Sequence, residues 1–337
     1  MEGAGERDKM SKPKVLLTGR IPHDVMAALK QACEVEANRE DRPMERTRIL
    51  ELIGDKDGLL SMITDRVDGE FMDRAPRLRM IANMAVGYNN IDVRAATARG
   101  IPVSNTPGVL TDATAELAFA LILAAARRIV EMDELTRRGG FRFWAPMLFL
   151  GTEVTGKTLG IIGLGRIGKA VARRARGFDM QVLYNSSGRM EAAEERELQV
   201  EYADLKRLLR ESDFVSLHVP LTEKTKHLIG ANELAMMKPT AFLINTSRGP
   251  VVDEQALVKV LRERKIGGAG LDVYENEPAL APGLTELDNV TLLPHIGSGT
   301  LETRTRMASL AVENLLAGLR GDVPPNILNP EVMKNRR

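Results

Sequence analysis

Residues 158–168 read Thr-Leu-Gly-Ile-Ile-Gly-Leu-Gly-Arg-Ile-Gly, a short apolar run that enters a glycine-rich turn. The residues after this turn have the pattern of a helix. Gly163, Gly165 and Gly168 match the spacing G-x-G-x-x-G. In that motif the first glycine permits a tight turn, the second lets the backbone approach a pyrophosphate, and the third lets helix and strand pack closely. Because strand, turn and helix follow in this order, the stretch predicts a dinucleotide-binding site.

The composition indicates a globular protein with more than one domain. The chain has 337 residues, 44% of them hydrophobic and 28% charged, which allows two domains of ordinary size. A net charge of +1 predicts neither nucleic acid nor an anionic membrane as a partner. Cys33 is the single cysteine, which favours a reducing, cytoplasmic location. No apolar run approaches the roughly 20 residues of a membrane span, and residues 1–12 are expected to form a flexible tail.

Apolar runs alternate with helical patterns on both sides of the glycine turn, and this alternation is typical of parallel α/β sheets. We expect a Rossmann-type doubly wound sheet in a dinucleotide-binding domain, residues 111–299. A smaller, flavodoxin-like α/β domain is expected from residues 13–110 and 300–337, because a long helix over 301–319 returns to it.

Two segments between the two strand-rich parts of the chain stand out. Within residues 111–129, the segment 115–126 is apolar on nearly all sides, which predicts a buried helix over this stretch. Residues 139–151 include Phe141, Phe143, Trp144 and Phe149 in a chain with only 4% aromatic residues. Such a concentration indicates an interface or a pocket wall, although a plug in the protein's own core is an equally good interpretation.

The end of the second strand of the nucleotide unit bears on the choice of cofactor. An acidic residue at this place, roughly 20 residues after the fingerprint, is typical of NAD sites. Here the chain reads Asn185-Ser-Ser187-Gly188-Arg189, without an acid. Hydroxyl groups and a guanidinium can bind a 2′-phosphate, so NADPH is favoured and NADH remains possible. An ordinary solvated turn is the alternative.

Later strands end in groups that can carry chemistry. Arg248, Asp272 and His295 each follow an apolar run, and the carboxyl ends of parallel strands meet at one edge of a sheet. Arginine can bind a carboxylate through two hydrogen bonds, and histidine is a common proton donor. A nearby glutamate would stabilise the imidazolium, but the spacing does not choose between Glu275 and Glu277. The set matches the reduction of a 2-keto acid, against the alternative of surface ion pairs and a structural histidine.

Four motifs together resemble the D-isomer-specific 2-hydroxyacid dehydrogenase family over nearly the whole chain. They are residues 163–168, Asn-Thr-Ser-Arg-Gly at 245–249, Leu-Asp-Val-Tyr-Glu-Asn-Glu-Pro at 271–278, and Pro-His-Ile-Gly-Ser at 294–298. Residues 85–92 and the segment around Trp144 are most similar to the glyoxylate/hydroxypyruvate reductases of that family. Some related reductases carry an extra basic residue where Ser187 stands.

This resemblance implies roles for individual residues. It selects Glu277 over Glu275 and makes Arg248, Glu277 and His295 catalytic. It implies that the substrate is bound by Arg248, His295 and the backbone amides of Val86 and Gly87. It also implies that the smaller domain binds the substrate, and that the protein is a homodimer in which the loop around Trp144 reaches towards the partner. No metal ligands are expected. The residues expected to bind the cofactor are Thr111, Gly163, Gly165, Arg166, Ile167, Gly168, Ser187, Gly188, Arg189, Thr246, Ser247, Asp272 and Gly297.

Several functions remain open at this point. The leading one is NAD(P)H-dependent reduction of glyoxylate to glycolate and of hydroxypyruvate to D-glycerate. Enzyme alternatives are a D-3-phosphoglycerate dehydrogenase and a D-lactate or gluconate-type dehydrogenase. A dinucleotide-sensing scaffold, similar to transcriptional corepressors of the same fold, is the alternative outside enzymology.

Overall fold

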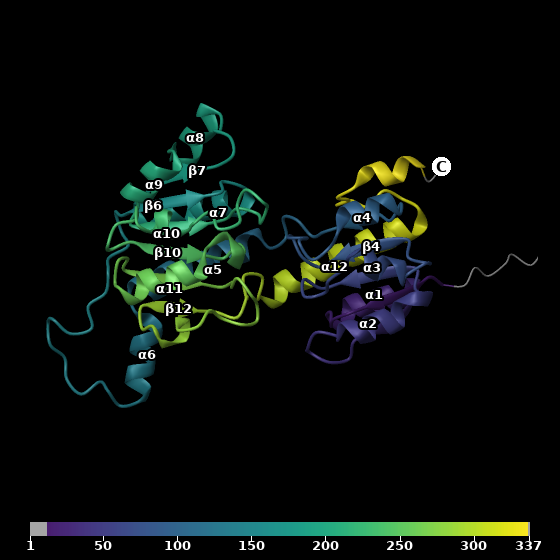
Figure 1. Cartoon of the computed structure of the whole chain (residues 1–337), viewed down its shortest axis with the longest axis horizontal. Helices are drawn as coiled ribbons and strands as arrows, with labels where there is room; N and C mark the ends of the chain where they lie inside the picture. The colour runs from purple at the N-terminus through teal and green to yellow at the C-terminus, as the bar shows by residue number, and fades with distance from the viewer. Residues whose placement is uncertain (1–11, 336–337) are drawn as a thin grey trace, which may run out of the picture. The chain divides into compact units, whose positions relative to one another are not determined.

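The computed structural model describes residues 12–335, which form two compact units. Unit 1 lies within residues 12–109 and 300–335, and unit 2 comprises residues 110–299 (Figure 1). The expected tail, residues 1–12, lies outside the described residues except for Lys12. None of the described helices is both long and apolar enough to span a bilayer.

Unit 1 contains a five-stranded, wholly parallel sheet in the order β2-β1-β3-β4-β5. This is the flavodoxin-like order. Buried side chains alternate between its two faces: Leu16 packs on one face, and its neighbours Val15 and Leu17 pack on the other. The strands are β1 (Lys14–Leu17), β2 (Glu34–Ala37), β3 (Gly58–Ser61), β4 (Met80–Asn83) and β5 (Val103–Ser104).

Helices cover both faces of this sheet. One core joins the strands to α1 and to α12, and the other joins them to α2, α3 and α4. The long helix α12 therefore belongs to unit 1, although it follows unit 2 in the sequence. The helices are α1 (His23–Ala32), α2 (Arg46–Leu52), α3 (Gly69–Asp73), α4 (Val93–Ala98) and α12 (Leu301–Arg320).

Unit 2 contains a seven-stranded parallel sheet in the order β12-β11-β10-β9-β6-β7-β8. The six strands from β8 to β11 follow the doubly wound Rossmann order, and β12 extends that sheet at one edge. The order reverses beside β6, which places the topological switch point at the glycine turn. The strands are β6 (Thr158–Ile162), β7 (Gln181–Asn185), β8 (Val200–Tyr202), β9 (Phe214–Leu217), β10 (Phe242–Asn245), β11 (Gly268–Leu271) and β12 (Val290–Leu292).

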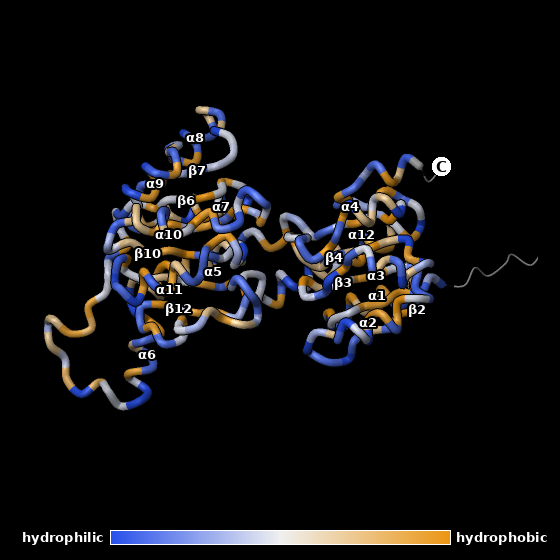
Figure 2. The backbone as a smooth tube through the Cα atoms, in the orientation of Figure 1, coloured by the Kyte–Doolittle hydropathy of each residue, from blue (hydrophilic) through white to orange (hydrophobic). Residues whose placement is uncertain are grey.

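Two hydrophobic cores hold this sheet between helical layers. One contains α5 and α7, and the other contains α9, α10 and α11. Figure 2 shows hydrophobic stretches within unit 2, and further ones in a segment that projects from it. The helices are α5 (Thr111–Ala126), α6 (Ile129–Arg137), α7 (Arg166–Ala175), α8 (Ala192–Leu198), α9 (Leu205–Glu211), α10 (Ala231–Leu234) and α11 (Glu254–Arg262).

The fold class expected from the sequence is confirmed, but one helix is corrected. The expected helix over 111–129 ends at Ala126, because Arg128 takes a left-handed backbone conformation with φ 55°. A separate helix, α6, starts at Ile129 and has no buried residues. The apolar character of α5 therefore does not continue into α6.

Candidate active site

The turn between β6 and α7 has the shape that its glycines require. Gly163 has φ 98°, and a Cβ there would lie 2.7 Å from the backbone carbon of His218. A Cβ on Gly168 would lie 2.2 Å from the carbonyl oxygen of Gly163. A Cβ on Gly165, in contrast, would meet nothing within 4 Å. The first and third glycines are therefore needed for packing, and the second borders open space at the start of α7.

The start of α7 also leaves hydrogen-bond donors available. Gly165 is the N-cap residue, and no side chain caps the helix. The first amides of a helix lack partners within the helix and carry a partial positive charge. Open space beside such amides accommodates a phosphate group.

Two buried oxygens lie at the carboxyl ends of the neighbouring strands. Thr246 Oγ1 follows β10 and Asp272 Oδ2 follows β11, and neither has a hydrogen-bond partner within the described residues. The other oxygen of Asp272 accepts a bond of 2.7 Å from the amide of Ile296. Burial raises the pKa of Asp272. Buried polar atoms normally have partners, so these two oxygens and the glycine turn fit a bound dinucleotide.

His295 and Glu277 form a pair beyond the ends of β12 and β11. The distance between His295 Nδ1 and Glu277 Oε2 is 2.8 Å. Glu277 Oε1 accepts a second bond, of 3.0 Å, from the amide of Tyr274. Burial opposes ionisation of Glu277, but the bond and charge of His295 outweigh it, so the pKa of Glu277 lies below its ordinary value. The pair therefore presents a fixed imidazole backed by a carboxylate.

Nε2 of His295 has no hydrogen-bond partner in residues 12–335. The backbone of His295 is left-handed, with φ 54°, a conformation that costs about 1–2 kcal/mol outside glycine. The surrounding contacts must hold it in place. The arrangement leaves one ring nitrogen available to exchange a proton with a bound molecule.

Arg248 follows β10 and is largely buried without an acidic partner in the described chain. Its Nη1 donates only to the carbonyl of Ser247, at 2.7 Å. Burial lowers the pKa of Arg248, and the charge of Glu277 acts in the opposite direction. The backbone after Arg248 passes close to the backbone of Tyr274. Only glycine fits at position 249, because a Cβ there would lie 1.8 Å from the backbone carbon of Tyr274. A guanidinium in this setting can bind a carboxylate or polarise a carbonyl.

The structure distinguishes Glu275 from Glu277, between which the spacing in the sequence does not choose. Glu275 Oε1 lies 2.6 Å from Nε2 of His227, and the amide of Glu275 donates to Glu254. Only Glu277 contacts His295. Glu275 therefore belongs to a separate group of side chains.

The loop after β7 holds Arg189 in a network that the sequence did not indicate. Nε and Nη2 of Arg189 donate to the two carboxylate oxygens of Glu195, at 3.0 and 2.9 Å. Tyr184 donates to the same carboxylate at 2.7 Å, and the guanidinium lies over the ring of Tyr202. The bonds from Arg189 and Tyr184 hold the pKa of Glu195 at about 2.

Other expected cofactor residues lie around the same sheet edge. Ser187 and Gly188 are exposed beside Arg189. Thr111 is the first residue of α5. Thr114, which also lies in α5, donates a bond of 3.1 Å to the carbonyl of Gly297. Ser247 is tied to Asn245 by both its amide and its hydroxyl.

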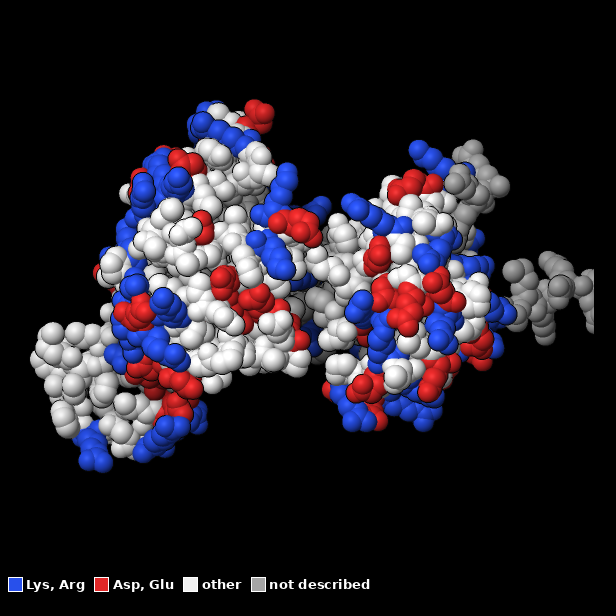
Figure 3. Space-filling model, viewed as in Figure 1, with Lys and Arg blue, Asp and Glu red and all other residues white. Residues whose placement is uncertain are grey.

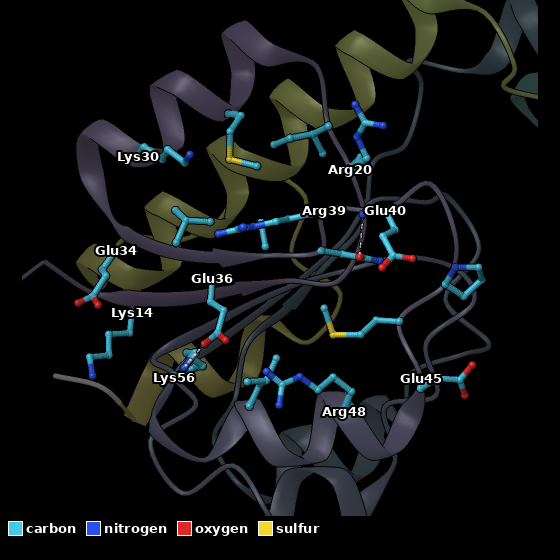
Figure 4. A pocket seen from close by; sticks show the side chains of 18 of the residues that line it. Lys14, Arg20, Lys30, Glu34, Glu36, Arg39, Glu40, Glu45, Arg48 and Lys56 are labelled. Atoms are coloured by element: carbon cyan, nitrogen blue, oxygen red, sulfur yellow. Dashed lines mark hydrogen bonds and ion pairs between the residues drawn. The ribbon is translucent and has the colours of Figure 1, made fainter.

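Val86 and Gly87 lie in unit 1, in the loop after β4. Neither backbone amide donates a hydrogen bond to any described residue. A cavity of about 1000 Å³ elsewhere in unit 1 contains neither of them. Figure 4 shows that its walls mix side chains of both charges, such as the contact between Lys56 and Glu36. This mixture gives no reason to assign the cavity to a small anionic substrate.

The aromatic segment over 139–151 is exposed. The exposed fraction is 57% for Phe141, 66% for Phe143 and 77% for Trp144. Figure 2 shows the segment projecting from unit 2 with hydrophobic stretches, and Figure 3 shows it as a largely uncharged surface. The interpretation as a plug in the protein's own core is wrong, because these rings have no core around them. An interface remains the better interpretation.

Comparisons with known proteins point to one group of enzymes. Residues 119–297 match the family model described as D-isomer specific 2-hydroxyacid dehydrogenase, NAD binding domain. A glyoxylate reductase of Korarchaeum cryptofilum is 53% identical over 328 residues, which cover 96% of this chain and 98% of that protein. A glyoxylate reductase of Thermococcus litoralis is 52% identical, with coverage of 96% and 98%.

Solved structures give the same result. A protein of Thermus thermophilus matches with a TM-score of 0.88 and 45% identity, covering 94% of this chain and 99% of that one. An NADPH-dependent glyoxylate/hydroxypyruvate reductase of Sinorhizobium meliloti, in complex with NADP and malonate, matches with a TM-score of 0.82 and 33% identity. That match covers 95% of this chain and 98% of the other.

Proposed function

The chain belongs to the D-isomer-specific 2-hydroxyacid dehydrogenase family, and on this premise we propose that it reduces glyoxylate to glycolate and hydroxypyruvate to D-glycerate. The observation that carries the proposal is the pair of His295 and Glu277 beside Arg248, which has no acidic partner in the described chain. These groups lie at the same sheet edge as the glycine turn and the unpartnered oxygens of Thr246 and Asp272. The glyoxylate reductases to which the chain is similar add support for the substrate.

Each residue has a defined task in this proposal. The bound nicotinamide cofactor supplies a hydride to the keto carbon. Nε2 of His295 gives a proton to the oxygen that becomes the hydroxyl group. Glu277 holds the ring through Nδ1 and stabilises its protonated form. Arg248 orients the keto acid and polarises its carbonyl, and the amides of Val86 and Gly87 bind the substrate carboxylate.

The assignment of the two units follows from these tasks. Unit 2 would bind the cofactor, through the turn at Gly163–Gly168 and through Thr246 and Asp272. Unit 1 would supply the carboxylate contacts of Val86 and Gly87. The C-terminal helix α12 packs within unit 1 and would serve as part of that substrate-binding domain.

We propose NADPH as the preferred cofactor, with NADH accepted. Residues 185–189, at the end of β7, contain no acid to repel a 2′-phosphate, and Nη1 of Arg189 has no partner in the described chain. Glu195 neutralises part of the charge of Arg189 while it fixes the guanidinium in place. We therefore expect the protein to use NADPH measurably better than NADH, but to accept both.

A second copy of the chain is the proposed partner of the exposed aromatic loop. The side chains of Phe143, Trp144 and Met147 are each at least 66% exposed, and aromatic residues and methionine are enriched in protein interfaces. Light scattering during gel filtration should give the mass of a homodimer, and replacement of Trp144 and Phe143 by serine should shift it towards the monomer. The use of a single cysteine, Cys33, supports a cytoplasmic location.

A substrate panel tests the proposed function. The purified protein is mixed with NADPH or NADH and with glyoxylate, hydroxypyruvate, pyruvate or 3-phosphohydroxypyruvate, and loss of the reduced cofactor is followed. Glyoxylate and hydroxypyruvate should give the highest kcat/KM. A preference for the phosphorylated substrate would favour a D-3-phosphoglycerate dehydrogenase, and cofactor binding without any turnover would favour the scaffold alternative.

A further inference from the structure

Three consecutive carbonyls in the loop after β4 are held by hydrogen bonds from the interior of unit 1. The carbonyl of Ala85 accepts from the amide of Thr106 at 2.9 Å. That of Val86 accepts from Nδ2 of Asn105 at 2.8 Å. That of Gly87 accepts from Nδ2 of Asn83 at 3.0 Å. Each of these three peptide groups is therefore fixed in orientation.

The orientation of these carbonyls sets the direction of the next amides. In a trans peptide the N–H points away from the C=O. The amides of Val86, Gly87 and Tyr88 therefore point away from the donors that hold the carbonyls. None of the three donates a hydrogen bond within residues 12–335, and all three residues reach the surface. Successive free amides that point away from the protein interior can bind an anion together, as the amides of a backbone nest do.

Asn83 is the side chain best placed to control this nest. It ends β4 and has no exposed surface. Its Oδ1 accepts a bond of 3.2 Å from Ser61, its register partner in β3. The side chain of Asn90, which lies 3.4 Å away, donates to the carbonyls of Met62 and Asp65 at 3.1 Å each. The Oδ1 of Asn83 is thus held by the protein interior, and this fixes the direction in which its Nδ2 donates to the carbonyl of Gly87.

We propose that Asn83 is a positioning residue for a three-amide oxyanion nest, in which the amide of Tyr88 binds a carboxylate together with those of Val86 and Gly87. The nest takes a carboxylate group of a small anion. Its identification with the keto-acid carboxylate rests on the proposed function. The new elements are the third donor, Tyr88, and the dependence of the nest on a buried asparagine that does not itself touch the substrate.

The first test uses the wild-type protein saturated with NADPH. Oxalate is titrated while the backbone amide signals are followed by 15N–1H NMR. The signals of Val86, Gly87 and Tyr88 should all shift, and should saturate at the same oxalate concentration. A saturable shift elsewhere, with these three signals unchanged, would overturn the nest. If the amide signals of Val86 and Gly87 shift and that of Tyr88 does not, Tyr88 is not a donor to the anion.

The second test compares two buried asparagines of unit 1. Asn83→Asp keeps the shape of the side chain but replaces the Nδ2 donor by an oxygen that repels the Gly87 carbonyl. Asn329→Asp is the matched control, because Asn329 is also buried and bonds the backbone at Val103 and Ile101 but none of residues 85–88. Thermal denaturation of both variants reports any general loss of stability.

Asn83→Asp should raise the KM for glyoxylate and the oxalate dissociation constant by about tenfold, which corresponds to the loss of a well-placed hydrogen bond. Its kcat and its NADPH affinity should stay within about twofold, as expected for a uniform binding contribution. Asn329→Asp should leave the KM unchanged. An equal effect of both variants on KM would overturn the positioning role.

The two proposals fail in different ways. If the wild-type protein does not reduce glyoxylate with either cofactor, the proposed function is wrong, and the oxalate titration still decides the nest. If Asn83→Asp does not fold, the wild-type titration alone decides whether the three amides bind the anion.

Discussion

Nδ1 of His295 lies 2.8 Å from Oε2 of Glu277, and the opposite ring nitrogen of His295 has no partner in the described chain. The carboxylate therefore fixes which nitrogen faces the protein and which is available to a ligand. Glu277 is itself fixed by the amide of Tyr274. This chain of contacts gives the imidazole a defined direction before any substrate arrives, and each link can be tested separately.

The first prediction concerns His295. Replacement by alanine removes the proton donor, and general acid catalysis contributes about 10²–10⁴-fold. We expect kcat for glyoxylate to fall by about that factor while the NADPH dissociation constant, measured by fluorescence titration, changes less than about twofold. A variant that no longer binds NADPH would show that His295 has a structural role instead.

The second prediction concerns the pH dependence of stability. Burial favours neutral Glu277, but the bond and charge of His295 outweigh it and depress the pKa below the ordinary 4.5. The folded protein thus binds fewer protons at this site than the unfolded chain, so stability rises with pH there. Ionised Glu277 therefore contributes fully to the free energy of unfolding above pH 4.5. This contribution is lost as the pH falls through the depressed pKa of the folded protein.

Glu277→Gln removes this contribution. Urea denaturation across a pH series should show the largest difference in free energy of unfolding near neutral pH, and the difference should shrink below pH 4.5. A difference that grows on acidification would contradict the assignment.

The third prediction separates two glycines of the same turn. Gly165→Ala adds a methyl group that meets no protein atom, so it should cost the free protein less than about 1 kcal/mol. It should nevertheless weaken NADPH binding by about tenfold or more, because the methyl group points into the phosphate space. Gly168→Ala clashes with the carbonyl of Gly163 and should cost about 1–3 kcal/mol of stability.

Urea denaturation without cofactor and NADPH titration measure both effects. Equal losses of stability in Gly165→Ala and Gly168→Ala, or wild-type NADPH binding by Gly165→Ala, would mean that the open space is not the phosphate site.

The fourth prediction concerns Arg189. Its replacement by alanine should reduce the ratio of kcat/KM with NADPH to that with NADH by about tenfold, as expected for the loss of a charge-assisted hydrogen bond. Arg207→Ala is the matched control, because Arg207 is also a partly exposed arginine that pairs with two glutamates of unit 2. If the two variants give the same cofactor ratio, the 2′-phosphate is bound elsewhere.

Much of the fold could be predicted because inner parallel strands are buried on both faces and appear as apolar runs. β2 and β8 contain no apolar run that would predict a strand, and both lie at the edges of their sheets. β2 reads Glu-Val-Glu-Ala, and its two charged residues interrupt the apolar run by which a buried strand is predicted. The break at Arg128 was also missed, since nothing in an arginine indicates a left-handed backbone.

The candidate site was partly visible in the sequence because parallel strands bring their carboxyl ends to one edge. Arg248, Asp272 and His295 could be found from that rule alone. Glu195 and Asn83 could not, because their importance depends on side-chain contacts with Arg189 and with the Gly87 carbonyl. The only signal for Asn83 is a polar residue at the end of a buried strand.

The most direct measurement follows the hydride itself. The protein is incubated with glyoxylate and with NADPH that carries deuterium at both C4 positions, and the glycolate formed is analysed by mass spectrometry. Wild-type protein should form glycolate with one deuterium on the hydroxyl-bearing carbon, and His295→Ala should form much less of it. Absence of deuterated glycolate with wild-type protein, under conditions in which NADPH binds, would show that the protein does not transfer a hydride from NADPH to glyoxylate.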